Sequence, residues 1–192
     1  MSAALHRIPS GPVLTTLVLL IGLLPSCGRP DPARLAEVDR LLGTCDSLGT
    51  VVNGIDADAY RRMDSIFGTQ RAWFDERFRD TLDTASARIL GNYHRAMNGP
   101  LQELLEAHTT LMAGIDSSST RLGRLKHDLS QALLEEGPAT AALQAEHDHL
   151  QQWRTNADVL LQGLPVIDAT WDQYHAAVDS MITPTDTIAD RP

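Results

Sequence analysis

The sequence lacks the motifs by which enzymes are usually recognised. It contains no Gly-x-Ser-x-Gly, no glycine-rich phosphate loop, and no cysteine–histidine pair at a known catalytic spacing. Nucleophilic catalysis and nucleotide binding therefore have no support, and no small-molecule substrate can be identified. We predict that the protein is not an enzyme and needs no cofactor.

Basic side chains are scarce as well. The chain has 16 lysines and arginines against 25 acidic residues, and its formal net charge is −9. Lys126 is its only lysine. An acidic surface repels phosphate backbones and anionic headgroups, so we do not expect binding to nucleic acid.

No segment has the alternating pattern of a β-strand, and apolar residues recur instead at helical spacing. The apolar stripes cover residues 35–52, 60–82, 89–97, 101–115, 122–133, 143–164 and 167–181. We predict an all-α protein, either an antiparallel bundle or an elongated helical hairpin, with five to six helices within residues 32–182. Residues 183–192 are polar and contain two prolines, so we expect a disordered tail.

Several short segments are expected to start or stop these helices. Asp31-Pro32 and Asp83-Thr84 resemble helix starts, because an aspartate is a good N-cap and proline suits the first turn. Residues 54–56, 98–100, 116–120 and 137–138 are expected to interrupt the helical pattern. Pro165 is expected to kink or end the last long helix.

The first 27 residues carry three consecutive features of an exported protein. A short n-region ends at Arg7, an uncharged apolar stretch of signal-peptide length follows at 13–24, and Leu24-Pro25-Ser26-Cys27 comes next. This last motif resembles the lipobox of bacterial lipoproteins. The resemblance implies a signal peptide at 1–26, a lipid on Cys27, and a short tether at 27–31. The lipid would anchor the protein to a membrane of the cell envelope.

The residue after Cys27 is Gly28 rather than aspartate. By the sorting rule of enterobacterial lipoproteins, this implies the outer membrane, facing the periplasm, with the cell surface as an alternative. A lipid on Cys27 would leave Cys45, the only other cysteine, without a disulfide partner. Since Cys45 lies among leucines, we expect it to be a small buried apolar residue.

Histidines near acidic residues provide the candidate metal ligands. Glu146 and His149 form a Glu-x-x-His on a predicted helix, and Asp172 stands three residues before His175. In ferritin-like bundles, paired Glu-x-x-His motifs and two further glutamates bind two irons. In this chain, Glu103 or Glu106 would have to complete such a site. The alternative is an exposed acidic and histidine-containing patch without a metal.

Two further groups of residues have simpler interpretations. His108 lies on an apolar stripe, where a hydrogen-bonded core histidine is expected. Trp73, Trp153 and Trp171 lie at apolar positions of their helices and are expected to pack in the core.

Aspartate followed by serine or threonine and an apolar residue occurs repeatedly, as at Asp83-Thr84-Ala85 and Asp186-Thr187-Ile188. The pattern resembles the O-glycosylation sequon of exported proteins of Bacteroidota, which implies Thr84 and Thr187 as candidate sites. The alternative is ordinary helix capping.

Residues 120–129 together with Glu146 resemble small helical lipoproteins of Bacteroidota of uncharacterised function. This resemblance implies a fold and a location but no activity. The preferred hypothesis is a membrane-anchored binding or scaffold module that meets protein partners through helix faces. The alternatives are a metal-binding, di-iron-like bundle and an envelope chaperone that holds unfolded proteins.

Overall fold

The computed structural model describes residues 30–77 and 82–182, and every regular element in these ranges is an α-helix. The helices are α2 (Pro32–Asn53), α3 (Ala57–Arg77), α4 (Thr84–Met97), α5 (Pro100–Ser130) and α6 (Glu136–Ile182). The predicted all-α class is confirmed. Residues 1–29 and 183–192, which include the predicted signal peptide, most of the predicted tether and the predicted tail, lie outside the described residues.

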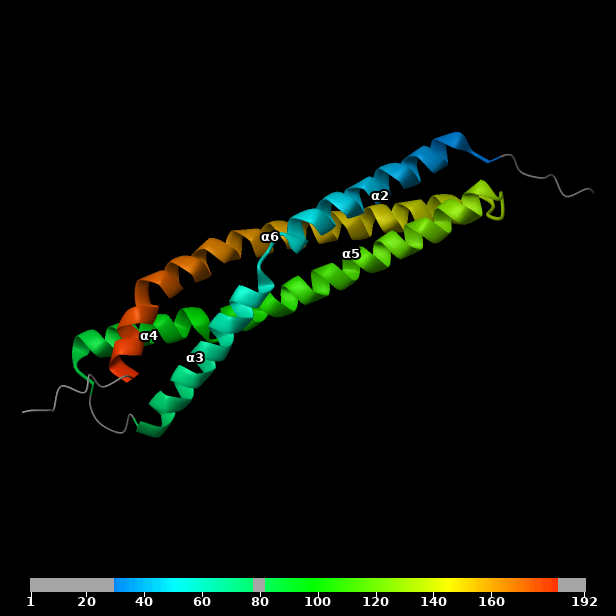
Figure 1. Cartoon of the computed structure of the whole chain (residues 1–192). Coiled ribbons are helices and arrows are strands. Elements are labelled where there is room, and N and C mark those ends of the chain that lie inside the picture. Colours follow the sequence, from blue (N-terminus) through cyan, green and yellow to red (C-terminus); the bar gives the residue numbers. More distant parts are fainter. Residues whose placement is uncertain (1–29, 78–81, 183–192) are drawn as a thin grey trace, which may run out of the picture.

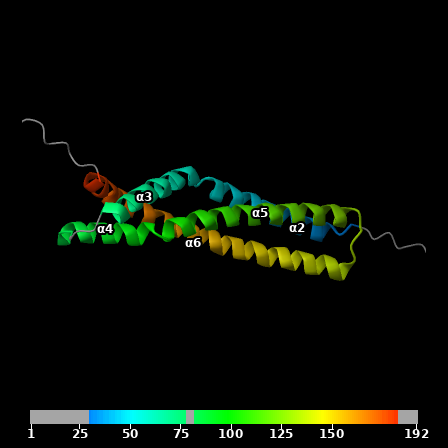
Figure 2. The same cartoon turned by 90° about the horizontal axis from the view of Figure 1, so that it is seen from below.

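The molecule is elongated around a long hairpin of α5 and α6, as Figures 1 and 2 show. α2 packs along one half of this hairpin, against α5 and also against α6, while α3 and α4 pack on the other half. The start of α2 lies beside the α5–α6 turn, where Arg34 Nη2 donates to Glu136 Oε1 at 2.8 Å. One end of the molecule therefore combines the beginning of α2 with this turn.

Local capping explains where two helices begin, as predicted. The carboxylate of Asp31 accepts hydrogen bonds from the backbone N–H groups of Ala33 and Arg34, and Asp83 caps α4 in the same way. The break at 98–100 is also confirmed. Gly99 has a φ of +102°, a conformation that glycine adopts without strain, and Pro100 then begins α5.

Two predicted breaks are wrong, so the division of the chain into helices differs from the prediction. Residues 116–120 are part of α5, because the buried residues Ile115, Ser118 and Leu122 continue its core-facing stripe. Tertiary packing there outweighs the weak helix propensity of serine. The turn before α6 lies at 131–135, and residues 137–138 belong to the first turn of α6.

Pro165 does not end the last helix, since α6 continues through it to Ile182. The axis of α6 bends toward its C-terminal part, drawn orange to red in Figure 1. A proline inside a helix removes one backbone hydrogen bond and favours such a bend. The predicted kink is therefore compatible with the continuous helix, and residues 167–181 belong to α6 rather than to a separate helix.

The core follows the apolar stripes along the whole hairpin. Leu150, Ala157 and Leu160 of α6 are buried, as their near-heptad spacing predicts. The three tryptophans are partly buried and pack against this core, as expected. Within residues 30–77 and 82–182, no helix is both long enough and apolar enough to cross a membrane.

Candidate functional site

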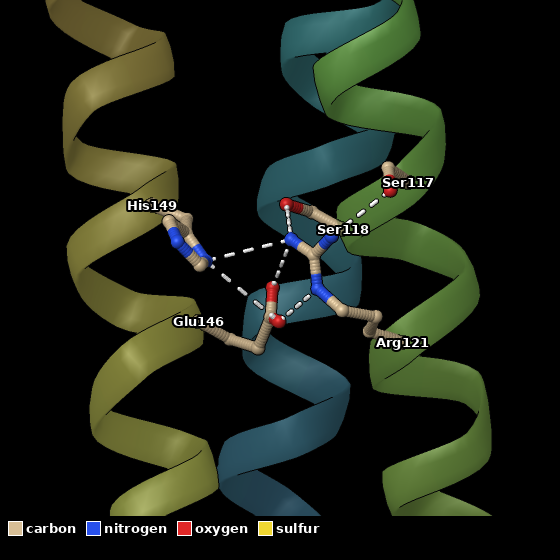
Figure 3. A network of polar contacts seen from close by, with 5 residues as sticks. All are labelled: Ser117, Ser118, Arg121, Glu146 and His149. Atoms are coloured by element: carbon tan, nitrogen blue, oxygen red, sulfur yellow. Dashed lines mark hydrogen bonds and ion pairs between the residues drawn. The ribbon is translucent and has the colours of Figure 1, made fainter.

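The most polar part of the interior lies where α2, α5 and α6 pack together, and it contains Glu146. This residue lies on the apolar seam of α6 and is only 5% exposed. A carboxylate in such a position needs a charged or hydrogen-bonding partner, because burial of an unpaired charge is costly. Figure 3 shows that α5 provides this partner.

Arg121 of α5 binds both carboxylate oxygens of Glu146. Its Nε donates to Oε1, and its Nη2 donates to Oε2 at 3.1 Å. The same guanidinium donates to the hydroxyl oxygens of Ser117 and Ser118, each at 2.9 Å. Its hydrogen bond to Glu146 raises the pKa of Arg121, which keeps the guanidinium protonated. The carboxylate is thus held in a two-pronged ion pair.

His149 lies one helical turn after Glu146, at the exposed edge of this network. Its Nδ1 lies 3.8 Å from Glu146 Oε1 and 3.4 Å from Arg121 Nη2. The sequence suggested two interpretations of Glu146 and His149, candidate metal ligands or an exposed patch without a metal. Neither describes this arrangement fully, since Glu146 is buried and paired with an arginine. Arg121 was not recognised as its partner, because 25 residues separate the two in sequence.

Cys45 of α2 is buried beside the same network and is a free cysteine. Burial raises the pKa of its thiol to about 11, with further contributions from the negative charges of Asp46 and Glu146. The thiol is therefore protonated and unreactive near neutral pH. The prediction of a small buried apolar residue is confirmed.

The candidate metal ligands do not converge on one centre. Glu146 and His175 belong to the same continuous helix and are 29 positions apart, which corresponds to about 43 Å along its axis. Glu103 and Glu106 line a different groove, beside residues 156–167 of α6. Within the described ranges, no group of three or more histidine, cysteine, aspartate or glutamate side chains is arranged to hold a metal ion.

His175 instead belongs to a second polar cluster, at the other half of the hairpin. Its ring stacks on Trp171 with 4.0 Å between centroids, and its Nδ1 lies 3.2 Å from Nε2 of Gln70. The Oε1 of Gln70, which is 4% exposed, accepts a hydrogen bond from the hydroxyl of Tyr93 at 2.8 Å. Gln70 had one sequence signal, since it is a polar residue on an otherwise apolar stripe.

The remaining candidates are placed as follows. His108 is partly buried, and its Nε2 lies 3.3 Å from the carbonyl oxygen of Val52, as expected of a hydrogen-bonded core histidine. Thr84 is exposed at the first position of α4, where Asp83 is engaged in capping. Thr187 and Cys27 lie outside the described residues.

Comparison with known proteins gives no relative for this chain. No protein-family description, no curated protein and no solved structure matches it.

Proposed function

We propose that this protein is a lipid-anchored scaffold or binding module of the bacterial cell envelope, held to the outer membrane through Cys27. The observation that carries the proposal is the motif Leu24-Pro25-Ser26-Cys27, which directly follows an uncharged apolar stretch of signal-peptide length. Two or three acyl chains would hold the protein durably, because each buried methylene contributes about 0.8 kcal/mol.

The shape of the helical part is compatible with such a role. Pro32 begins α2 only five residues after Cys27, so the tether can span at most about 18 Å. The start of α2 lies at one end of the elongated hairpin, beside Glu136. α6 has 47 residues and a length of about 70 Å. An anchor at this end would present the long helical faces away from the bilayer, where a protein partner can reach them.

The polar network supports a structural role for the part of the module near the α5–α6 turn. The bidentate contact of Arg121 with Glu146 ties α5 to α6, and the hydroxyl of Ser118 accepts from the same guanidinium. These contacts satisfy both oxygens of the buried carboxylate. A buried carboxylate that is paired on both oxygens with an arginine suits a scaffold better than a catalyst.

The lipid anchor can be tested by expressing the gene in a bacterium that has an outer membrane and fractionating its cell envelope. We expect the wild-type protein in the membrane fraction, with the mass of a chain that starts at Cys27 and carries acyl groups. Cys27→Ser should abolish acylation. The matched control is Cys45→Ala, which changes the only other cysteine and should leave the lipid in place. Equal acylation and equal membrane association of the Cys27→Ser variant would refute the proposal.

A further inference from the structure

A groove with a volume of about 740 Å³ lies between α5 and α6, on the part of the hairpin that starts about 30 Å from the α5–α6 turn. Its apolar floor consists of Leu104 and Leu111 of α5 and Leu160 and Ile167 of α6, which are 2–6% exposed. These leucines and the isoleucine already belong to the core. The groove, named here the α5–α6 groove, therefore exposes the outer side of the core.

The edge of the groove is more apolar than a solvated helix face. Val159 and Val166 of α6 line it and are 66% and 64% exposed. They are seven residues apart, so both lie on the same face of the helix. Small residues, including Ala107 and Gly163, line the walls and leave the space open. Exposed apolar surface beside a groove is typical of an interaction site.

The charged residues that line the groove have one sign. Glu103 and Glu106 of α5 both line it and are exposed, whereas no lysine, arginine or histidine is among its described lining residues. A partner that fills the groove with aliphatic side chains would place its own flanking residues next to these carboxylates. Basic residues in those flanking positions gain attraction and acidic ones are repelled.

We infer that the α5–α6 groove binds an amphipathic helix of a protein partner, with an aliphatic face and basic flanks. The groove is lined from Pro100 to Leu111 on α5 and from Asn156 to Ile167 on α6, a length of about 17 Å. This length corresponds to three helical turns. The partner's aliphatic residues at positions i, i+3 or i+4, and i+7 then enter the groove, as in other helix-in-groove complexes.

Two other occupants fit the charges less well. A second copy of this chain, docked by the same face, would bring the Glu103 and Glu106 carboxylates of two molecules together, and like charges repel. The carboxylate of a fatty acid or an anionic lipid headgroup meets the same repulsion. The inference deepens the proposed binding role but does not depend on the lipid on Cys27.

The test uses a fluorescein-labelled helical peptide of about 18 residues, built from leucine, alanine and lysine with the leucines on one face. Its binding to the full-length protein is measured by anisotropy. Protein recovered from the membrane is held in phosphatidylcholine nanodiscs, with empty discs as the blank. We expect saturable binding. A peptide with glutamate in place of lysine, and a shuffled peptide without an apolar face, should bind at least about tenfold more weakly.

Paired variants locate the binding site. Val159→Asn with Val166→Asn should weaken binding at least about tenfold, because it replaces the apolar edge of the groove by polar side chains without adding a charge. The matched control, Val51→Asn with Leu133→Asn, changes two exposed apolar residues outside the groove and should bind like the wild type. Glu103→Gln with Glu106→Gln should weaken binding several-fold and reduce its dependence on salt concentration. The matched control, Glu135→Gln with Asp172→Asn, removes two exposed carboxylates outside the groove and should change neither property.

A photoreactive version of the lysine peptide provides a readout on the unaltered protein, independent of how the variants fold. Its cross-links should map to residues 100–111 and 156–167. Cross-links elsewhere, equal binding of the glutamate peptide, or equal loss in the control variants would overturn the inference. A concentration-dependent dimer that Val159→Asn with Val166→Asn dissociates would show that the groove binds a second copy, which would also overturn the inference. The Cys27 experiment is unaffected by any of these results, so failures of the anchor and of the groove can be told apart.

Discussion

Among the glycines that the structure describes, Gly114 of α5 has the least room for a side chain. A Cβ atom at this position would lie 2.5 Å from Cζ2 of Trp153 and 2.7 Å from its Cε2 and Cη2. These distances are far below van der Waals contact, so the indole of α6 must move if Gly114 is replaced. The close approach of α5 and α6 at this level depends on the missing side chain.

The magnitude can be worked out by comparison with Gly123 on the same helix, where a Cβ would meet nothing within 4 Å. Replacing glycine by alanine inside a helix gains about 1 kcal/mol from backbone propensity. Gly123→Ala should therefore raise the free energy of unfolding by up to about 1 kcal/mol. Gly114→Ala receives the same gain but also overpacks the interface, which costs about 1–3 kcal/mol.

The difference between the two variants isolates the clash, because the propensity contribution is common to both. We expect Gly114→Ala to be about 1–3 kcal/mol less stable than Gly123→Ala, or roughly 2–12 °C lower in Tm for a chain of this size. Urea and thermal unfolding followed by circular dichroism measure both quantities. Trp153→Phe in the Gly114→Ala background should recover part of the loss, since a smaller ring makes room for the added methyl group.

The reasoning would be refuted if Gly114→Ala were as stable as Gly123→Ala. A double-mutant cycle over positions 114 and 153 gives a second criterion. Additive effects of the two substitutions would show that Gly114 and Trp153 do not interact in the way described.

Two further predictions concern the interior where α2, α5 and α6 pack together. Arg121→Met should lower the free energy of unfolding by about 2–3 kcal/mol, because it leaves the Glu146 carboxylate buried without its ion pair. The loss is moderate because Arg121 is partly exposed, so water can take over some of its hydrogen bonds to the carboxylate. Arg121→Met with Glu146→Leu should recover most of this loss in urea unfolding, and a double variant no more stable than the single one would contradict the account. In a Cys27→Ser background, Cys45 should not react with a disulfide reagent at pH 8 until urea is added, because burial raises the pKa of its thiol to about 11. Rapid reaction of the folded protein with the disulfide reagent would contradict this burial. Since the unfolded thiol ionises near pH 9 and the folded thiol near pH 11, the protein should lose stability between about pH 9 and 11. Cys45→Ala should remove this part of the loss.

Much of the secondary structure followed from local rules. The periodic apolar residues indicated helices throughout, and the caps at Asp31 and Asp83 depend on side chains that bind the next few backbone N–H groups. The burial of Cys45 followed from its place on an apolar stripe. Such features involve residues within one or two turns of each other, so the order of the amino acids suffices to predict them.

The errors in helix boundaries have the opposite origin. Residues 116–120 look like a serine-rich turn, yet Ser118 is fully buried and accepts a hydrogen bond from Arg121. Local propensity is a weak preference of a few tenths of a kcal/mol for each residue, and the packing of α5 against α2 and α6 outweighs it. From the sequence alone, Glu146 could be interpreted as a metal ligand or as a surface residue, because its partner Arg121 is on another helix.

The linear order of residues thus indicated an all-helical chain, an acidic surface and a lipobox-like N-terminus, since each is a property of composition or of near neighbours. Only the folded hairpin decided that Glu146 pairs with Arg121, that His175 meets Gln70, and that Val159 and Val166 flank an acidic groove. These relationships join different helices, and their geometry depends on how α3, α5 and α6 pack. That packing results from the sum of many weak contacts across the core, which no single segment of the sequence contains.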